Sequence, residues 1–388
     1  MINFNFNNDC CGCRACSEIC PKKCISIEKN KKGFFIPVVD KQNCIDCGLC
    51  ERVCPVLNVN KKEYPDRKLY CAYNKDAEKR KEGSSGSIFY VLAEFVISKG
   101  GYVCGAAFDE DLQLRHKMIN TLEEVIPLMK SKYIQSNTDG IFVKVKKQLI
   151  NNQYVLFVGT PCQVQALYNF LGKKEYEKLI LVDFICHGVP SQELFDRCIR
   201  QYEEDNNCKV VDFCFREKTA TQLHNCKIVY DNRQGKRCEE VKRYIDFPFY
   251  SGYLKYIDFR DCCYSCAFVG KDRISDFTLG DFWELEFSGL VKDFYKGYSM
   301  LYVNSIKGSL VLQRLGSFIN IKETALDSPL TKNFAYLKPT KRSILNKFFM
   351  WDYNRISHKS LEKRYFSNFR EFPLYKKIIW KIILTLNI

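Results

Sequence analysis

Eight cysteines near the amino terminus fall into two copies of one spacing. In each copy three cysteines stand three residues apart, and a fourth follows four residues later, directly before a proline. The copies are Cys10, Cys13, Cys16 and Cys20-Pro21, and Cys44, Cys47, Cys50 and Cys54-Pro55. Three thiolates at this interval can wrap a loop around one face of an iron–sulfur cube, while the fourth points towards a second cube. The spacing therefore predicts two 4Fe-4S clusters in a protein that carries electrons.

The longer step before the fourth cysteine predicts how the ligands are shared. We expect each cluster to take three ligands from one copy and its fourth from the other. The two expected sets are Cys10, Cys13, Cys16 and Cys54, and Cys44, Cys47, Cys50 and Cys20. Zinc sites or a disulfide knot are the alternatives, but two full copies, each closed by Cys-Pro, favour iron–sulfur clusters.

Four later cysteines predict a third 4Fe-4S cluster. Cys162 lies where a predicted strand gives way to a helix, and Cys186 follows another predicted strand. Because loops at the carboxyl ends of neighbouring strands converge on one crevice, both thiols can approach the pair Cys263 and Cys266. Two alternatives stay open: Cys262 in place of Cys263, or Cys162 and Cys186 as ordinary buried side chains.

The remaining pattern predicts the domain organisation. We expect an α+β ferredoxin-like module with a hairpin in residues 1–60, a linker in 61–68, and an α/β domain with a mixed sheet and an added antiparallel portion in 69–335. Strands are expected at 69–73, 102–108, 154–158 and 179–184, and antiparallel strands at 210–216 and across 226–238 with a turn at 231–235. Helices are expected at 87–99, 122–129, 141–151, 163–171 and 192–204.

Charge and targeting signals suggest where the chain works. The formal net charge is +15 before any cluster is bound, and residues 336–388 form a basic, aromatic tail. The tail suggests an acidic partner protein or peripheral contact with the inner membrane surface, or else a helix packed on the domain. No nucleic-acid motif accompanies it. Without a signal peptide or an apolar run of 18 residues, and with cysteines at metal-binding spacings, we expect a cytoplasmic protein.

A Gly/Ser-rich segment suggests a phosphate site. Gly83, Ser84, Ser85, Gly86 and Ser87 come directly before a predicted helix, so their N–H groups and hydroxyls could hold a phosphate at the helix amino terminus. Such a segment is also a common helix cap. No GxGxxG motif follows a strand, so an ordinary dinucleotide fold is not supported.

Several segments, taken in order, resemble the family of coenzyme F-420 hydrogenase/dehydrogenase beta subunits, in its bacterial form with an amino-terminal two-cluster ferredoxin. The resemblance spans about residues 5–310 and is carried by 83–87, 159–163, 186–191, 263–266 and 275–283. It implies a bound FAD near the third cluster, with Lys132 and Tyr133 bordering the flavin; a solvated helix end is the alternative interpretation of this pair. It also implies electron exchange between a two-electron carrier, such as the deazaflavin F-420, and one-electron carriers such as ferredoxin.

His187 is the histidine that stands beside a proposed ligand. It could relay a proton to a reduced flavin, hydrogen-bond a cluster sulfur or cap a turn, whereas His116, His224 and His358 show no supporting constellation. We therefore expect an iron–sulfur flavoprotein oxidoreductase with a redox partner protein. The alternatives are an electron-relay subunit that serves a partner reductase without a substrate site of its own, and a structural or sensing metal protein.

Overall fold

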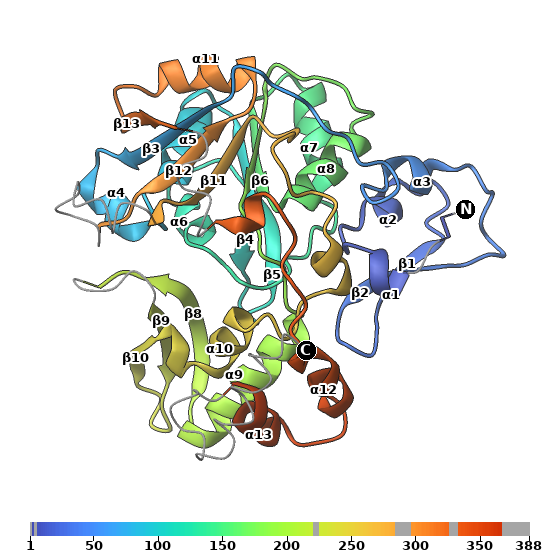
Figure 1. Cartoon of the computed structure of the whole chain (residues 1–388), viewed down its shortest axis with the longest axis vertical. Coiled ribbons are helices and arrows are strands. Elements are labelled where there is room, and N and C mark those ends of the chain that lie inside the picture. The colour runs from blue at the N-terminus through green and yellow to red at the C-terminus, as the bar shows by residue number, and fades with distance from the viewer. Residues whose placement is uncertain (1, 4–5, 220–224, 284–295, 326–332, 367–388) are drawn as a thin grey trace.

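A small amino-terminal module lies beside a larger α/β body in the computed structural model (Figure 1), which describes residues 2–3, 6–219, 225–283, 296–325 and 333–366. The module contains two antiparallel strands, so the predicted hairpin is confirmed. Its elements are α1 (Phe6–Asp9), α2 (Ala15–Ile19), β1 (Ile25–Lys29), β2 (Phe35–Val39) and α3 (Leu49–Val53).

The body is built on an eight-stranded mixed sheet in the order β13-β3-β12-β11-β7-β6-β4-β5. Its four central strands, β11, β7, β6 and β4, run parallel, and the strands outside them are antiparallel. The bounds are β3 (Lys68–Asn74), β4 (Tyr102–Phe108), β5 (Leu114–Ile119), β6 (Val155–Gly159), β7 (Leu179–Phe184), β11 (Phe277–Asp281), β12 (Ser299–Val303) and β13 (Ile319–Thr324). The mixed sheet agrees with the prediction, but β5, β11, β12 and β13 were not foreseen.

Helices cover both faces of this sheet. The bounds of the body's α-helices are α4 (Ala77–Glu82), α5 (Ile88–Ser98), α6 (Val125–Leu128), α7 (Ile141–Ile150), α8 (Pro161–Phe170), α9 (Gln192–Asn206), α10 (Pro248–Leu254), α11 (Ile306–Arg314), α12 (Leu345–Asp352) and α13 (His358–Leu361). Alternate residues of one strand serve opposite cores: Leu156 packs with α5 and α11, whereas Val155 and Phe157 pack with α7 and α8. Central parallel strands are therefore apolar on both faces.

A second, antiparallel sheet lies apart from the large one, with the order β10-β9-β8 (Figure 1). Its strands are β8 (Lys209–Glu217), β9 (Asn225–Asp231) and β10 (Arg237–Arg243), and the turn between the last two contains Gly235 at φ 73°. The predicted antiparallel portion and its turn are confirmed. An aromatic core joins this sheet to α9 and α10.

The described part of the basic tail packs onto that aromatic core. Phe349, Tyr353, Leu361, Tyr365 and Phe366 are all buried there, which fits the packed-helix alternative for residues up to 366. The last stretch, 367–388, lies outside the described residues. Within the described ranges, no helix is both long enough and apolar enough to span a membrane.

Four short turns complete the description: η1 (Tyr244–Asp246), η2 (Asp261–Ser265), η5 (Phe334–Tyr336) and a π-turn, η6 (Glu362–Phe366). The turn η2 follows Arg260, which fastens the amino-terminal module to the body. The Arg260 guanidinium donates to the carbonyl oxygens of Cys10 at 2.9 Å and Phe35 at 2.7 Å, and to Gln135 Oε1 at 2.9 Å. Only 1% of Arg260 is exposed.

Replacing Arg260 with methionine should loosen the module from the body. Hydrogen bonds from a charged donor contribute about 1.5–3 kcal/mol each, and a buried acceptor left without its donor carries a desolvation cost. We expect a loss of roughly 3–5 kcal/mol at the interface, seen as faster amide hydrogen exchange in β2 and faster proteolysis between residues 58 and 68. Arg355→Met, at an exposed arginine, should leave both rates unchanged; equal rates in the two variants would contradict this role of Arg260.

Candidate functional site

The two halves of the amino-terminal module repeat one local geometry. Cys16 and Cys50 each take the second position of a one-turn helix that starts after a left-handed residue, Arg14 (φ 62°) or Gly48 (φ 70°). Cys20 and Cys54 follow these helices in the extended conformation. An extended residue directs the chain away from its own helix. This is the local geometry needed if each fourth cysteine binds the cluster of the other copy, as predicted.

The structure groups the eight cysteines as the spacing predicts. One small cavity is lined by Cys10, Cys13, Cys16 and Cys54, and another by Cys20, Cys44, Cys47 and Cys50. Gly12 allows the first group to form: it has φ 68°, and a Cβ there would meet Gln135 and Arg260. The positions agree with the two expected ligand sets, and their role as ligands stays a prediction.

The third group of cysteines also converges. Cys162 in the first turn of α8, Cys186 just after β7, and Cys263 and Cys266 around η2 line one common cavity of about 50 Å³. Burial raises the pKa of the Cys186 thiol well above its usual range, and the neighbouring thiols of Cys263, Cys162 and Cys266 raise it further. Four sulfurs that face one another in this way are a donor set suited to a 4Fe-4S cluster.

Cys262 lines the same cavity, but its surroundings differ from those of Cys263. Cys262 packs with Cys11, Cys13 and Cys162, whereas Cys263 packs against the aromatic core. The pKa of Cys263 is lowered, chiefly by a hydrogen bond with Cys262. The arrangement favours Cys263 as the ligand and Cys262 as its hydrogen-bonding neighbour, and the choice stays a prediction.

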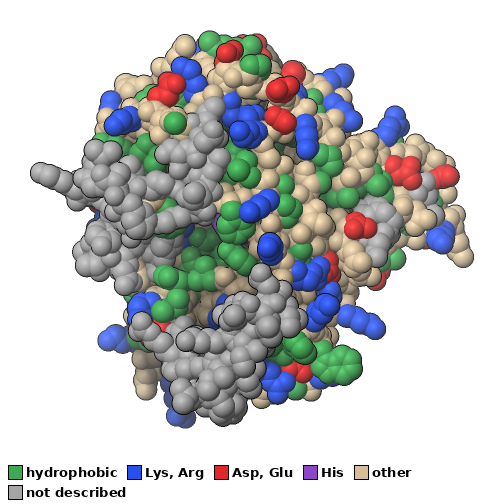
Figure 2. Space-filling view, viewed as in Figure 1, with side chains coloured by type: hydrophobic (Ala, Val, Ile, Leu, Met, Phe, Trp, Pro, Cys, Tyr) green, Lys and Arg blue, Asp and Glu red, His purple; other side chains and the backbone are tan. Residues whose placement is uncertain are grey.

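A much larger cavity, of about 530 Å³, lies between the large sheet and the small one. Its walls include the carboxyl ends of β6, β7 and β11, the amino terminus of α5, and tyrosines of α10. Figure 2 shows hydrophobic side chains at the bottom of the hollow between the two parts of the body. The carboxyl edge of a parallel sheet is the usual place for a ligand site in open α/β folds.

The Gly/Ser-rich segment contributes most of its residues to this cavity. Gly83, Ser84, Ser85 and Ser87 line the wall, ahead of α5. Gly86 is not part of the lining: its N–H donates to Ser299 Oγ at 2.9 Å, and a Cβ there would strike the backbone of Ala72. Gly86 therefore allows close packing on β3 and β12, which differs from its expected part in a phosphate site.

A buried arginine holds the tyrosine that the family resemblance places beside the flavin. Arg216, only 3% exposed, donates to both carboxylate oxygens of Asp281 at 3.0 and 3.1 Å and to the Tyr133 hydroxyl at 3.0 Å. Asp281 also accepts a hydrogen bond from Ser85. Since Ser85, Tyr133, Arg216 and Asp281 all line the large cavity, one polar network connects strand β8 to the Gly/Ser-rich segment.

Lys132 and two histidines add titratable groups to the wall. Burial lowers the pKa of Lys132 to about 7, and its ammonium donates to the carbonyl oxygens of Pro127 and Met129. His116, which showed no constellation in the sequence, lies in the wall, and burial lowers its pKa to about 4. Within the described chain, Ser87 Oγ, His116 Nδ1 and His187 Nδ1 are buried without a hydrogen-bond partner.

Neighbouring sites share walls and form one series. Cys186, His187 and Thr160 line both the large cavity and the third cysteine cavity. The hydroxyl of Thr160 lies 3.1 Å from Cys162 Sγ. Cys11 in turn lines both the third cysteine cavity and the cavity of the first cysteine set. The large cavity therefore adjoins the third cysteine group, and the third group adjoins the set of Cys10, Cys13, Cys16 and Cys54. That set packs in turn beside the set of Cys20, Cys44, Cys47 and Cys50.

Gly188 shows why the Cys186-His187-Gly188 sequence suits this junction. It has φ 134°, and a Cβ there would strike the ring of Phe259. The His187 ring is stacked on Tyr256 at 6.2 Å and meets Phe334 edge-on at 5.3 Å, so its position is set by packing. His224, the other histidine without a predicted role, lies outside the described residues.

A dicluster module, a third cysteine group and an adjoining cavity are features expected of an iron–sulfur electron-transfer protein. Residues 9–58 match the 4Fe-4S dicluster domain, and residues 152–328 match the carboxyl-terminal region of the coenzyme F420 hydrogenase/dehydrogenase beta subunit. The chain therefore carries an amino-terminal dicluster domain and, behind it, a region similar to the carboxyl-terminal part of coenzyme F420 hydrogenase/dehydrogenase beta subunits.

Two relatives in sequence agree with these matches. An F(420)H(2) dehydrogenase subunit of Methanosarcina mazei is 23% identical over 184 residues, which are 45% of this chain and 51% of that protein, so the chain matches about half of it. A 7Fe ferredoxin of Hydrogenibacillus schlegelii is 37% identical over 17% of this chain and 81% of its own length. Among solved structures, a chain from the F420-reducing [NiFe] hydrogenase complex of Methanosarcina barkeri is 16% identical, with 79% of this chain and 93% of that chain covered and a TM-score of 0.42.

Paired cysteine variants should reveal how the module shares its ligands. If three 4Fe-4S clusters are present, the chain holds about twelve iron atoms. Cys54→Ser should lower this to about eight, and adding Cys13→Ser should remove no more, because both residues serve the same cluster. Adding Cys47→Ser instead should leave about four. Cys104→Ala, at an isolated buried thiol, is the control that keeps all the iron; equal iron contents in the two double variants would contradict the exchange.

The pKa of Lys132 predicts a pH effect on an anionic ligand of the large cavity. Its folded pKa of about 7 lies below the usual 10.5, so the ammonium charge is present below about pH 7 and is lost as the pH rises through that value. If the ligand is a flavin nucleotide, as the family resemblance implies, its retention, followed by fluorescence of released flavin, should weaken between pH 6 and 8.5. Lys132→Met should flatten this dependence and Lys347→Met, at an exposed lysine, should preserve it. A pH profile that Lys132→Met leaves intact would exclude Lys132 as its source.

Proposed function

We propose that this chain is an iron–sulfur flavoprotein oxidoreductase. FAD occupies the large cavity, and three 4Fe-4S clusters are held by the three cysteine groups. The enzyme passes electrons between a two-electron carrier, deazaflavin-like or another reduced donor, and a one-electron carrier such as ferredoxin. The observation that carries the proposal is the wall that the large cavity shares with the third cysteine group through Cys186 and His187.

The large cavity offers polar groups suited to a flavin nucleotide. The amino terminus of α5 opens onto it, and Ile88, Phe89 and Tyr90 of the first turn are part of its lining. A helix amino terminus attracts phosphate through its free N–H groups. The Ser87 hydroxyl beside it is 3% exposed and has no protein partner among the described residues, as expected of a group that binds a ligand.

The rest of the cavity suits an aromatic ring system. Tyr133, Tyr250 and Tyr253 surround one another with ring centroids 4.5–6.1 Å apart, and all three line the cavity. Aromatic walls with few polar groups are typical of cofactor sites. Arg216 fixes Tyr133 through its hydroxyl, so this wall is held in place before a ligand binds.

A bound flavin supplies the exchange between two-electron and one-electron chemistry. The chain's own residues bind, orient and connect. Ser87 and the α5 amino terminus hold phosphate, Lys132 places positive charge on the cavity wall, and Tyr133 borders the ring. We assign to His187 the exchange of a proton with the ligand, because it is the histidine in the wall common to both cavities.

The shared walls give the electron a short route out of the body. The third cysteine group adjoins the first group through Cys11, and the first adjoins the second within the module. Cys47 of the second group is the exposed member of the set. A one-electron partner protein, such as ferredoxin, would therefore exchange electrons at the module's second cluster.

Spectra of protein purified without oxygen test this proposal. We expect a flavin band on a broad iron–sulfur absorption, about one FAD per chain and about twelve iron atoms. A reduced deazaflavin or another reduced two-electron donor should bleach the flavin band, and added oxidised ferredoxin should restore it. Protein that contains its full iron and no flavin would overturn the proposal.

The same experiment separates the enzyme from a simple relay. A relay subunit without a substrate site would hold the clusters, and reduced ferredoxin would bleach its absorption, but no small two-electron carrier would. Deazaflavin, nicotinamide and quinol donors should each be tried, since the cavity defines the electron chemistry and not the donor. Bleaching by reduced ferredoxin alone would favour the relay role.

A further inference from the structure

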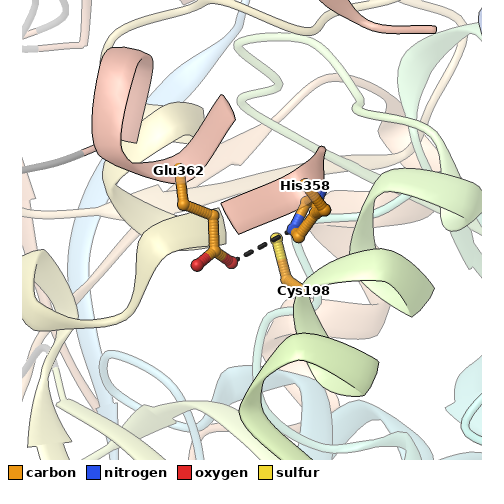
Figure 3. Close-up of side chains that lie close together, drawn as sticks. All are labelled: Cys198, His358 and Glu362. Carbon is orange, nitrogen blue, oxygen red and sulfur yellow. Dashed lines mark hydrogen bonds and ion pairs between the residues drawn. The ribbon is translucent and has the colours of Figure 1, made fainter. Parts of the chain in front are cut away.

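Three side chains of metal-binding types meet outside the three cysteine cavities, between α9 and the end of the described chain. Cys198 comes from α9, His358 begins α13, and Glu362 begins the π-turn η6. Figure 3 shows the three side chains directed towards one another. The Cys198 sulfur, a histidine ring nitrogen and a glutamate oxygen all lie within 4.8 Å of one another.

The setting is well shielded from water. Cys198 is 1% exposed, and the side chains of His358 and Glu362 are 12% and 16% exposed. His358 Nε2 lies 3.1 Å from Glu362 Oε1. Residues four apart on a helix share a face, so His358 and Glu362 form a chelating pair, and Cys198 approaches them from the neighbouring helix.

The local helix geometry is also unusual. The α-helix His358–Leu361 changes to a π-turn at Glu362, and single π-turns are rare and occur often at functional sites. The change begins at the residue that supplies the oxygen ligand. The change in helix geometry and the group of metal-binding side chains therefore coincide at Glu362.

The charges around the cluster favour a cation. The Glu362 carboxylate lies beside the Cys198 thiol in a setting largely closed to water. Asp258 adds a second buried carboxyl close by. Arg197, which precedes Cys198 in the chain, is engaged with Glu193, Asn354 and the Tyr353 carbonyl. A divalent cation would balance a thiolate and a carboxylate in surroundings that otherwise disfavour both.

We propose that Cys198, His358 and Glu362 bind one zinc ion, with water as a fourth ligand. Sulfur, nitrogen and oxygen donors at about 2.0–2.3 Å from the metal are usual for zinc, and this mixed set suits it better than calcium or magnesium, which prefer oxygen alone. All three donor atoms already lie within 4.8 Å of one another, so small side-chain adjustments would arrange them around one ion. The site is distinct from the iron–sulfur centres and does not depend on the proposed flavin chemistry.

Zinc at this position would fasten the described end of the chain to the aromatic core. The residues after the ligands, Tyr365 and Phe366, pack in that core, and a Cβ on Gly252 of α10 would touch the Phe366 ring. Tyr250 and Tyr253 of the same helix line the large cavity. Metal binding would therefore support the aromatic wall of the cavity from behind.

A nucleophilic role for Cys198 fits less well. Its sulfur is buried, and Cys198 does not line the large cavity or any of the three cysteine cavities. His358 Nε2 is paired with Glu362 Oε1, and His358 Nδ1 has no hydrogen-bond partner among the described residues. The Cys198 sulfur is therefore not hydrogen-bonded to the nitrogen opposite the carboxylate, as a catalytic triad requires.

Zinc and iron should be counted together in full-length protein purified without oxygen and supplied with zinc sulfate. We expect about one zinc per chain on top of the full iron content. Cys198→Ala, His358→Gln and Glu362→Gln should each lower zinc at least tenfold while iron stays unchanged, and should lower Tm. Cys226→Ala, at another fully buried cysteine of the same aromatic core, should keep zinc, which separates ligand loss from a packing defect.

Two results would overturn the proposal. One is wild-type protein with its full iron and less than a tenth of a zinc per chain after zinc is supplied. The other is zinc that remains in the Cys198→Ala/His358→Gln double variant, since the metal would then be bound elsewhere. If the single variants do not fold, X-ray absorption at the zinc edge of the wild-type protein gives the answer: one sulfur and otherwise nitrogen and oxygen donors support the site, and a shell made mainly of sulfur, as in a cysteine cluster site, overturns it.

Discussion

Burial of one guanidinium group underlies the arrangement of the whole chain. Arg260 stands directly before the turn that carries Cys263, and its hydrogen bonds end on the backbone of the amino-terminal module at Cys10 and Phe35. A buried charge is tolerated only where its donors are satisfied, so the module must sit in this one position. The same contact brings Cys11 to the wall of the third cysteine cavity, which makes the cysteine groups neighbours.

The next residue reinforces this position with opposite charge. Asp261, 8% exposed, is paired with Lys32 of the module and with Arg342 from the chain's carboxyl-terminal part. Arg260 and Asp261 together thus connect the amino-terminal module, the turn η2 and the carboxyl-terminal part of the chain, next to the third cysteine group. The body is stabilised by apolar packing instead. Alternate apolar residues of β6 pack into the cores on opposite faces of the sheet, so both faces are covered. The carboxyl edge of the sheet is not covered in this way and forms part of the wall of the large cavity.

The spacing of cysteines along the chain predicted those parts of the site whose residues lie close together in the sequence. The cysteine repeats predicted both groupings in the module, since a loop of three residues between thiols leaves few geometries. Cys162 and Cys186 were also found, because both follow strands of one parallel sheet. Arg216 and His116 were missed. Arg216 lies on a strand of the small sheet, which reaches the cavity only because that sheet approaches the large one, and His116 lies on β5, an edge strand of the large sheet that the sequence did not reveal. Gly86 looked like a phosphate ligand but serves close backbone packing.

The sequence by itself determined the electron chemistry, because iron–sulfur ligation is encoded in short spacings, and it determined the alternating strands and helices of the body. Tertiary structure alone decided how the sites connect. The wall shared at His187, the bridge at Cys11 and the meeting of Cys198 with His358 join residues far apart in the chain, and their contact depends on packing between whole elements. Periodicity reports which face of an element is apolar; it does not report which other element that face will meet.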